Sequence, residues 1–365
     1  GHALTDLALV GCTSFAVWNE KTRDGSLLIG RNLDFYAGDD FAENKIVYFI
    51  KPDLGHSYVS VSWPGMIGVV SGMNLEGLTV TINAGKSDIP WVAKTPVSIL
   101  AREILQYAKT IDAAIAIAKK REVFVSESIM VGSANDGKAI LLEVSPNHFG
   151  VYDVPNNSEL ICANHFQSET YKNDKKNNKH IIASHSKNRF DRMEELLEEN
   201  QTITPKEAVK ILRDKNGVKG KSIGFGNEKA LNQLLAHHGI VFKPKDKLVW
   251  ISANPYQLGE FVCYDLNKVF GSKIENNSTT SEMKTMAESN LNIEKDTFLE
   301  TKAYSDYEKY RIQNREFDHY IESKTAVSEE KISEFKSLNP EHWLAYYKIG
   351  KYYQEIKQYQ KAFDN

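Results

Sequence analysis

Apolar and polar positions alternate in many short stretches between residues 12 and 266, and turns rich in glycine or polar residues separate them. Alternation with a period of two predicts half-buried strands. Asp24-Gly25, between the first two stretches, predicts a tight hairpin. The predicted strands are 12–18, 26–30, 45–51, 58–63, 66–74, 77–85, 127–135, 138–145, 149–154, 159–166, 239–244, 247–253 and 260–266.

A helical period appears in four longer stretches, at 95–109, 112–120, 186–200 and 204–215. These predicted helices come in pairs between groups of strands, rather than alternating one by one with them. Such an order favours an α+β fold, with antiparallel sheets whose outer faces are covered by helices. It argues against a doubly wound parallel sheet.

The pattern changes near residue 272, after which the chain is polar, charged and helical in period. The stretch Gly271–Lys284 is expected to be a linker. Further on, Tyr346, Ile349, Gly350, Tyr353 and Ala362 have the spacing of a tetratricopeptide repeat, although a plain amphipathic helical hairpin is the alternative. Because one repeat cannot bury its own face, either further repeats follow or these helices pack on something else, and they are a candidate surface for a protein partner.

Two zones therefore follow from the pattern: 12–271 and 272–365. With 365 residues, 41% hydrophobic and 25% charged, the composition is that of an ordinary globular protein. The net charge of -3 gives no reason to expect nucleic acid as a partner. No apolar run approaches the roughly 18 residues that span a bilayer. The chain starts at Gly1 with no basic segment before Leu4–Gly11, so no signal peptide is inferred and the compartment stays open.

Two stretches that suggest ligand binding do not hold up. Gly217–Ser222 resembles a phosphate-binding loop, but Lys215 stands where the motif requires glycine. Adjacent His237 and His238 point to different faces, and no other ligands stand at metal-binding spacing, so a structural role is favoured. Neither a metal nor an organic cofactor is expected.

Cys12 is the strongest candidate for chemistry. Three cysteines in a chain of this length argue against a disulfide scaffold, and Cys162 and Cys263 stand among apolar strand residues. Cys12 differs, because Gly11 precedes it and the predicted hairpin returns Arg31 and Asp34 beside it. A papain-type protease is excluded, because there the cysteine opens a helix rather than a strand.

The order of these residues resembles the N-terminal-nucleophile hydrolases, in the branch that contains the penicillin-biosynthetic acyltransferases and the choloylglycine hydrolases. The stretches that carry the resemblance are "GCTS", "DG…GRNLDF", "MNLEGL…N", "ANHF" and "PYQLGEFVCYDL", between residues 11 and about 270. The last two favour the acyltransferase-like branch. The resemblance implies a four-layer αββα sandwich and cleavage of a small acyl-amide substrate through an acyl-thioester on the cysteine.

The resemblance also implies self-cleavage. In such enzymes the nucleophile is the first residue of the mature chain, and its own α-amine is the base. An α-amine titrates near ~7.7–8 and a thiol near ~8.5, so proton transfer between them is nearly balanced. Since the amine of Cys12 is bonded to Gly11, the Gly11–Cys12 bond must first be cut, and residues 1–11 would be the remnant of a pro-segment.

Further roles follow from the same resemblance. Arg31 would favour the thiolate of Cys12 and hold Asp34, and Asp34 would orient the new ammonium group. The oxyanion donors would be two asparagines, Asn83 and Asn164.

A late arginine, Arg189, would brace the site, with Arg192 as its rival. Each member of this set also has an ordinary explanation: a surface ion pair, a turn residue, a loop cap or a solvated helix face. The alternative function is a non-catalytic partner-binding module, in which a degenerate hydrolase domain is presented beside repeat-like helices.

Overall fold

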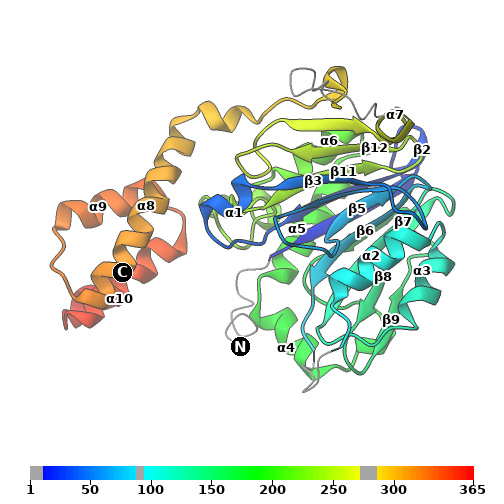
Figure 1. Cartoon of the computed structure of the whole chain (residues 1–365). Coiled ribbons are helices and arrows are strands. Elements are labelled where there is room, and N and C mark those ends of the chain that lie inside the picture. The colour runs from blue at the N-terminus through cyan, green and yellow to red at the C-terminus, as the bar shows by residue number, and fades with distance from the viewer. Residues whose placement is uncertain (1–10, 88–93, 272–285) are drawn as a thin grey trace.

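Two antiparallel sheets form the strand-rich part of the chain (Figure 1). They are seen in a computed structural model, which describes residues 11–87, 94–271 and 286–365. Most of the expected linker Gly271–Lys284 and nearly all of the expected pro-segment remnant therefore lie outside the described residues. The mixed α/β architecture with two antiparallel sheets confirms the fold class expected from the sequence pattern.

The seven-stranded sheet is a simple meander. Its strand order follows the chain, and most neighbouring strands are joined by short connections, whereas helices α2 (Val97–Tyr107) and α3 (Ile111–Ala118) lie between β6 and β7 in the chain. Local pairing of this kind is what short alternating stretches separated by turns predict. The strands are β3 (Ile46–Ile50), β4 (Tyr58–Ser62), β5 (Ser71–Asn74), β6 (Leu78–Ala84), β7 (Glu127–Ser133), β8 (Lys138–Val144) and β9 (Phe149–Tyr152).

The six-stranded sheet is built from distant parts of the chain, in the order β10-β1-β2-β11-β12-β13. The hairpin predicted at Asp24-Gly25 joins β1 to β2, and Gly25 has the positive φ of 71° that such a turn favours in glycine. The strands are β1 (Thr13–Asn19), β2 (Gly25–Leu33), β10 (Glu159–Cys162), β11 (His238–Lys243), β12 (Leu248–Ser252) and β13 (Phe261–Asp265).

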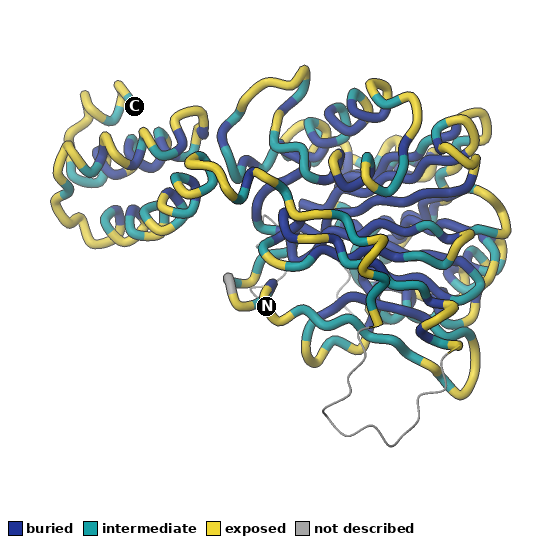
Figure 2. Tube along the Cα trace, turned by 90° about the horizontal axis from the view of Figure 1, so that it is seen from above, coloured by how far each residue is buried: buried dark blue, intermediate teal, exposed yellow. Residues whose placement is uncertain are grey.

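Apolar clusters lie on both sides of each sheet, and Figure 2 shows the strands as largely buried. One cluster joins the seven-stranded sheet to helices α2 (Val97–Tyr107) and α3 (Ile111–Ala118). A second joins the six-stranded sheet to α5 (Ser186–Glu199) and α6 (Pro205–Leu212). A third contains residues of both sheets.

Several shorter helices were not expected from the sequence, because none has a long apolar period. They are α1 (Asp39–Glu43), α4 (Lys175–Ala183), α7 (Leu266–Gly271) and the 3₁₀ turns Glu169–Tyr171, Val218–Gly220, Ser289–Leu291 and Thr297–Glu300. In the described part of the chain, no helix combines the length and apolar character that crossing a membrane requires.

The C-terminal residues fold into α8 (Lys302–Ser323), α9 (Glu329–Leu338), α10 (Trp343–Glu355) and α11 (Tyr359–Phe363), coloured orange to red at one side of Figure 1. Their aromatic core takes in Leu234, Tyr256 and Leu258 from the strand-rich part. The helices therefore pack on the rest of the chain, which is one of the two arrangements considered from the sequence.

Phe335 of α9 gives a test of this aromatic core. Its ring is fully buried and stacks on Tyr310 and Phe317, with centroids 5.1 Å and 4.3 Å away. Because truncation leaves a cavity, Phe335→Ala should lower the free energy of unfolding by about 3–5 kcal/mol in urea titrations. Tyr359→Ala, at a ring that is 66% exposed, should change it by less than about 0.5 kcal/mol. Equal stabilities for the two variants would contradict the assigned core.

Candidate active site

Cys12 lies at the start of β1, between β10 and β2 in the six-stranded sheet. In the register of β1 and β2, Ser14 is directly opposite Arg31. Opposed residues of an antiparallel pair lie on the same face, so the hairpin brings the arginine to the end of β1 that carries the cysteine. Nη2 of Arg31 is 3.7 Å from Sγ of Cys12.

The guanidinium of Arg31 is fully buried and crosses from one sheet to the other. Nη1 donates to the carbonyl oxygen of Val70 at 3.1 Å and to the hydroxyl of Ser71, and Nη2 donates to the carbonyl oxygen of Ile82. The expectation that this fork holds Asp34 is therefore corrected. The fork donates to the seven-stranded sheet and to the sulfur, and Asp34 feels it as a nearby charge.

Burial dominates the acidity of the thiol. It raises the pKa of Cys12, and the charge of Arg31 lowers it again without cancelling the rise. The carboxyl groups of Asp34 and of half-buried Glu127 add to the rise. Arg31 thus acts in the expected direction, but burial has the larger effect on the pKa of Cys12.

Asp34 follows the last residue of β2 and is also fully buried. Its Oδ2 accepts a hydrogen bond from Nε2 of Gln233 at 3.3 Å, while Oδ1 has no hydrogen-bond partner among the described residues. Burial raises the pKa of Asp34 to about 7, against the opposing charges of Arg189 and Arg31. The carboxyl group therefore exchanges its proton near neutral pH.

The two asparagines tie β6 to the end of β10. Nδ2 of Asn83 donates to the carbonyl oxygens of Cys162 and Ala163 at 3.0 Å and 3.2 Å, and its Oδ1 accepts from Ser14 at 2.9 Å. Nδ2 of Asn164 donates to the carbonyl oxygen of Ala84 at 2.9 Å. Both side chains are thus held close to the strand ends around the cysteine.

The two candidate arginines of α5 are separated by their partners. Arg189 donates from Nη2 to Oδ1 of Asn164 at 2.5 Å and from Nη1 to the carbonyl oxygen of Glu228 at 2.7 Å. Arg192 instead forms an ion pair with Asp214, with Nε at 3.0 Å from Oδ2. Of the two, Arg189 lies in the group around Asp34 and Cys12, whose charges act on it.

The structure rules out the ordinary explanations for most of this set. Arg31, Asp34 and Asn83 are 0% exposed, and Asn164 and Arg189 are 4% exposed. A surface ion pair and a solvated helix face are therefore wrong, and Asn83 lies within β6 rather than in a turn. The predicted residues are assembled around one sulfur.

Gln233 belongs to the same group and was missed from the sequence. Its Nε2 donates to the carbonyl oxygen of Gly11 at 2.9 Å as well as to Asp34. The amide N–H of Gly11 donates to the backbone carbonyl of Asp34 at 2.9 Å. A lone glutamine outside the helices and strands has no spacing or motif that would have marked it.

Apolar side chains also pack around Cys12, and we call this group the apolar wall. Cys12, Leu33 and Val70 form a small buried cluster, and half-buried Phe35, Trp63 and Met66 pack against it. The rings of Phe35 and Trp63 stack with centroids 5.6 Å apart. Because these side chains remain partly exposed, they offer an apolar surface close to the sulfur.

The histidine pair has a structural role, as expected. Nδ1 of His237 is 2.8 Å from Nδ1 of His238, and Nε2 of His238 is 2.9 Å from Oγ of Ser71, which accepts from Arg31. Burial lowers the pKa of both rings, for His237 to about 3. Within the described residues, no cluster of histidine, cysteine and carboxylate side chains is suited to a metal ion.

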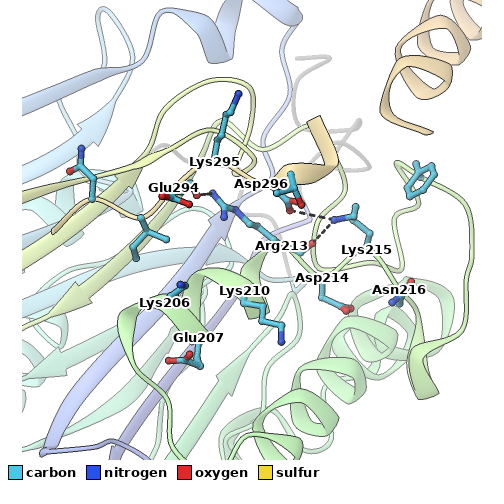
Figure 3. Close-up of a pocket in the computed structure, with 14 residues that line it drawn as sticks. Lys206, Glu207, Lys210, Arg213, Asp214, Lys215, Asn216, Glu294, Lys295 and Asp296 are labelled. Atoms are coloured by element: carbon cyan, nitrogen blue, oxygen red, sulfur yellow. Dashed lines mark hydrogen bonds and ion pairs between the residues drawn. The ribbon is translucent and has the colours of Figure 1, made fainter. Parts of the chain in front are cut away.

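Two hollows lie near the loops that follow α6. A groove of about 820 Å³ runs between α6, residues 213–216 and residues 292–297 (Figure 3), and none of the residues around Cys12 lines it. Its lining is strongly charged, and Lys215 and Asp296 form an ion pair there at 3.5 Å. A smaller pocket of about 210 Å³ has Gln233 in its wall together with Tyr307 and Tyr310 of α8.

The raised pKa of Asp34 predicts a pH dependence of stability. The folded protein keeps a proton up to about pH 7 that the unfolded chain releases near pH 4, so ionisation costs stability as the pH rises. Asp34→Asn imitates the neutral carboxyl group. The free energy of unfolding of Asp34→Asn, minus that of the protein with Asp34, should therefore rise by up to about 1.4 kcal/mol for each pH unit between about pH 4 and pH 7.

Urea unfolding between pH 4 and pH 8 measures this difference, with Cys12→Ala present in every chain and Cys12→Ala alone as the reference, so that chains with the Gly11–Cys12 bond intact are compared. Asp53→Asn removes an exposed carboxylate and serves as the control, for which the difference from the reference should stay flat. A flat profile for Asp34→Asn as well would contradict the assignment of a buried, proton-exchanging carboxyl group.

Comparison with known proteins places this site in context. Curated relatives include an uncharacterized protein of Archaeoglobus fulgidus, 32% identical over 149 residues, which are 39% of this chain and 24% of that protein. Protein dcd1B of Dictyostelium discoideum is 26% identical over 162 residues, which are 42% of this chain and 31% of that protein. The chain thus spans about a quarter to a third of the length of these relatives.

Solved structures with low identity are also similar. An N-acylethanolamine-hydrolyzing acid amidase ortholog of Caenorhabditis elegans is 19% identical, with a TM-score of 0.47 over 64% of this chain and 93% of that chain. A conjugated bile acid hydrolase of Clostridium perfringens is 17% identical, with a TM-score of 0.47 over 70% of this chain and 93% of that chain. Penicillin V acylase of Agrobacterium tumefaciens is 15% identical, with a TM-score of 0.44 over 70% of this chain and 87% of that chain.

The family comparison covers most of the strand-rich part. A family model described as "Acyl-coenzyme A:6-aminopenicillanic acid acyl-transferase" matches residues 18–254, which is more than half of the chain. The match begins just after Cys12 and includes the other residues assembled around it. The chain therefore belongs to the acyl-coenzyme A:6-aminopenicillanic acid acyl-transferase family.

Proposed function

We propose that the protein is a self-processing cysteine amidohydrolase that cleaves a linear amide through an acyl-thioester on Cys12. One observation carries the proposal: the sulfur lies 3.7 Å from a buried guanidinium, and the carbonyl oxygen of Gly11 and the carboxyl group of Asp34, with a pKa of about 7, accept hydrogen bonds from the same amide nitrogen of Gln233. A degenerate, non-catalytic module is not favoured, because a buried charged group without a function would only cost stability.

Self-cleavage is the first step. Sγ of Cys12 attacks the carbonyl carbon of Gly11, the carbon–nitrogen bond breaks, and the acyl group moves to sulfur. Water then hydrolyses the thioester, so the leading segment leaves with a carboxylate on Gly11 and the α-amine of Cys12 becomes free. The thiol proton must move first, and the carboxylate form of Asp34 is a suitable acceptor because its pKa lies near the working pH; Asp34 then gives this proton to the nitrogen of Cys12 as the carbon–nitrogen bond breaks.

Turnover uses the freed amine as the base. The α-amine takes the thiol proton, sulfur attacks the carbonyl carbon of the substrate amide, and the amine product leaves with that proton. Water then releases the acid and regenerates the thiol. Arg31 stabilises negative charge on the sulfur throughout, and Asp34 holds the ammonium form of the new terminus. We favour hydrolysis over transfer to a second amine.

The remaining polar residues support this cycle. The amide nitrogen of Asn164 has two hydrogens and gives one to Ala84, so its second hydrogen is suited to the oxyanion of a substrate. Asn83 gives its hydrogens to two carbonyls, which suits a positioning residue better than an oxyanion donor. Arg189 orients Asn164 through a charge-assisted hydrogen bond.

The acyl group of the substrate is proposed to be apolar. The partly exposed side chains beside the sulfur are aromatic or aliphatic, so an acyl chain or ring would remove them from water on binding. The amine part of the substrate is left open by these contacts. Hydrolysis of acyl-amides of small molecules is therefore the proposed activity.

Our interpretation of the architecture goes with this function. The apolar clusters on both sides of each sheet support a four-layer αββα sandwich over 12–271, with 1–11 as the pro-segment remnant. For 272–365, the close approach of α10 and α11 at Gly350, where a Cβ would lie 3.3 Å from the carbonyl of Ala362, supports a repeat-like helix pair. Exposed Tyr347 and Phe363 on these helices are suited to a protein partner.

The Cys12→Ala variant tests the proposal. Intact mass spectrometry of the wild-type protein should show a fragment that begins at Cys12, and the variant should remain whole, because the attacking sulfur is missing. Incubation with N-acyl amino acids, peptides, bile salts, penicillins and acyl-homoserine lactones should give an acyl adduct on the wild type alone. Cys263→Ala, at another buried cysteine, should behave as the wild type does. Cleavage of Cys12→Ala at an equal rate would point to an outside protease and end the proposal.

The apolar wall gives a second prediction. Trp63→Ala removes a large ring near the sulfur, so kcat/KM for substrates with apolar acyl groups should fall about tenfold or more, since burying such a side chain contributes roughly 1.5–3 kcal/mol. Self-cleavage should proceed at the wild-type rate. Ile182→Ala, at a side chain that is 87% exposed on α4, is the control. An unchanged kcat/KM for Trp63→Ala across the panel would rule out this acyl site.

A further inference from the structure

We propose that Gln233 is the oxyanion donor for self-cleavage at the Gly11–Cys12 bond. This inference rests on the proposed function and assigns the group that stabilises its first transition state. The side chain of Gln233 is 5% exposed, and its Nε2 donates to the carbonyl oxygen of Gly11 at 2.9 Å. That carbonyl belongs to the bond which must break.

The position of this donor matches the chemistry. When the sulfur bonds to the carbonyl carbon, the electron pair of the carbon–oxygen π bond moves to the oxygen, which becomes anionic. A donor about 2.7–3.1 Å from that oxygen stabilises the developing charge. The amide N–H of Gly11 is held at 2.9 Å by the carbonyl oxygen of Asp34, so both polar groups of the scissile residue are fixed. Fixing the reacting groups in advance lowers the barrier further.

Gln233 also accounts for the glycine before the nucleophile. A Cβ atom on residue 11 would lie 2.5 Å from Nε2 and 2.9 Å from Oε1 of Gln233. Any side chain there would push the amide away from the carbonyl oxygen. Glycine at this position therefore keeps the donor in contact with the bond to be cut.

The backbone around Gln233 is held rigidly. The carbonyl oxygen of Leu231 accepts from Nδ2 of Asn32 at 2.9 Å, and the N–H of Asn232 donates to the carbonyl oxygen of Asp214 at 2.8 Å. Oδ1 of Asn232 accepts from the N–H of Leu234, whose φ is positive at 52°. A non-glycine residue keeps such a conformation only where its surroundings fix it. The donor is thus set in place before the reaction.

The C-terminal helices hold the same loop from outside. Leu234 is part of their aromatic core, and Gln233 shares the wall of the 210 Å³ pocket with Tyr307 and Tyr310 of α8. By contrast, the amides of Asn83 and Asn164 donate to carbonyls of Cys162, Ala163 and Ala84 rather than to Gly11. Among these three amide side chains, Gln233 is the one directed at the scissile carbonyl.

A time course of self-cleavage tests the assignment. The full chain is made by cell-free synthesis, and intact mass follows the uncut fraction. Gln233→Ala and Gln233→Glu, which keeps the shape but loses the amide donor, should both process roughly 10²–10³-fold more slowly than the wild type. The matched control is Gln257→Ala, at a buried glutamine whose amide donates to Leu212 instead. It should process at the wild-type rate.

A second arm separates a role in self-cleavage from a role in folding or turnover. Each variant is also made as a chain that begins at Cys12, and its reaction with p-nitrophenyl octanoate, an activated acyl donor, is measured beside its thermal unfolding. Gln233→Ala should still fold cooperatively and should lose far less in turnover than in processing, because the Gly11 carbonyl is absent from this form and only the contact with Asp34 is lost. Wild-type processing by Gln233→Ala, or an equal loss of turnover in the form that begins at Cys12, would overturn the assignment.

Different experimental outcomes would contradict the proposed function and the proposed role of Gln233. If the wild-type chain stays whole, or if Cys12→Ala is cut as fast as the wild type, self-processing itself is wrong and the role of Gln233 falls with it. If cleavage depends on Cys12 but not on Gln233, the proposed function stands and only the oxyanion assignment is lost.

Discussion

The buried guanidinium of Arg31 is the constraint on which the site depends. A cation with 0% exposure must be surrounded by acceptors, because an unpaired buried charge costs several kcal/mol. Its acceptors are carbonyl oxygens of Val70 and Ile82 in the other sheet. One side chain therefore fixes the distance between the two sheets at the point where Cys12 lies. The sulfur completes the set of groups around the guanidinium, so the geometry of the nucleophile follows from the need to satisfy the charge.

Other polar contacts cross between the sheets at the same end. Ser14 of the six-stranded sheet donates to Asn83 of the seven-stranded sheet, and Asn83 donates in turn to the carbonyl of Cys162. Away from this end, the space between the sheets is filled by apolar side chains such as Met130 and Phe242. Buried polar groups rigidify a site when they are paired, and this network is largely paired. The apolar part stabilises the fold, while the polar part holds the candidate catalytic groups in one arrangement.

The sequence pattern was sufficient where the structure is local. Most pairings of the seven-stranded sheet and the approach of Arg31 to Cys12 follow from short connections, whose register is set by nearby residues. The pairing of β6 with β7 is the exception, because two helices lie between these strands. The pairing of β2 with β11 joins segments about 200 residues apart, and no local pattern specifies it. Gln233 could not be predicted for the same reason, since only the folded chain brings its side chain to the carbonyl oxygen of Gly11. The sequence also could not show that burial raises the pKa of Cys12 while the charge of Arg31 lowers it, because the spacing of residues carries no information on solvent access.

Burial has opposite consequences for the two forms of the protein that we propose. In the uncut chain it raises the pKa of the Cys12 thiol and raises that of Asp34 to about 7, so both acidic groups are held toward their neutral forms beside the buried guanidinium groups. Removal of the leading segment would place a new α-ammonium group beside the same carboxyl group. A cation at that distance favours the carboxylate and the thiolate alike, and its effect is strong because water is largely excluded. Cutting one bond therefore changes the electrostatics of the site in the direction that catalysis needs, and hydrolysis of the thioester makes that change irreversible.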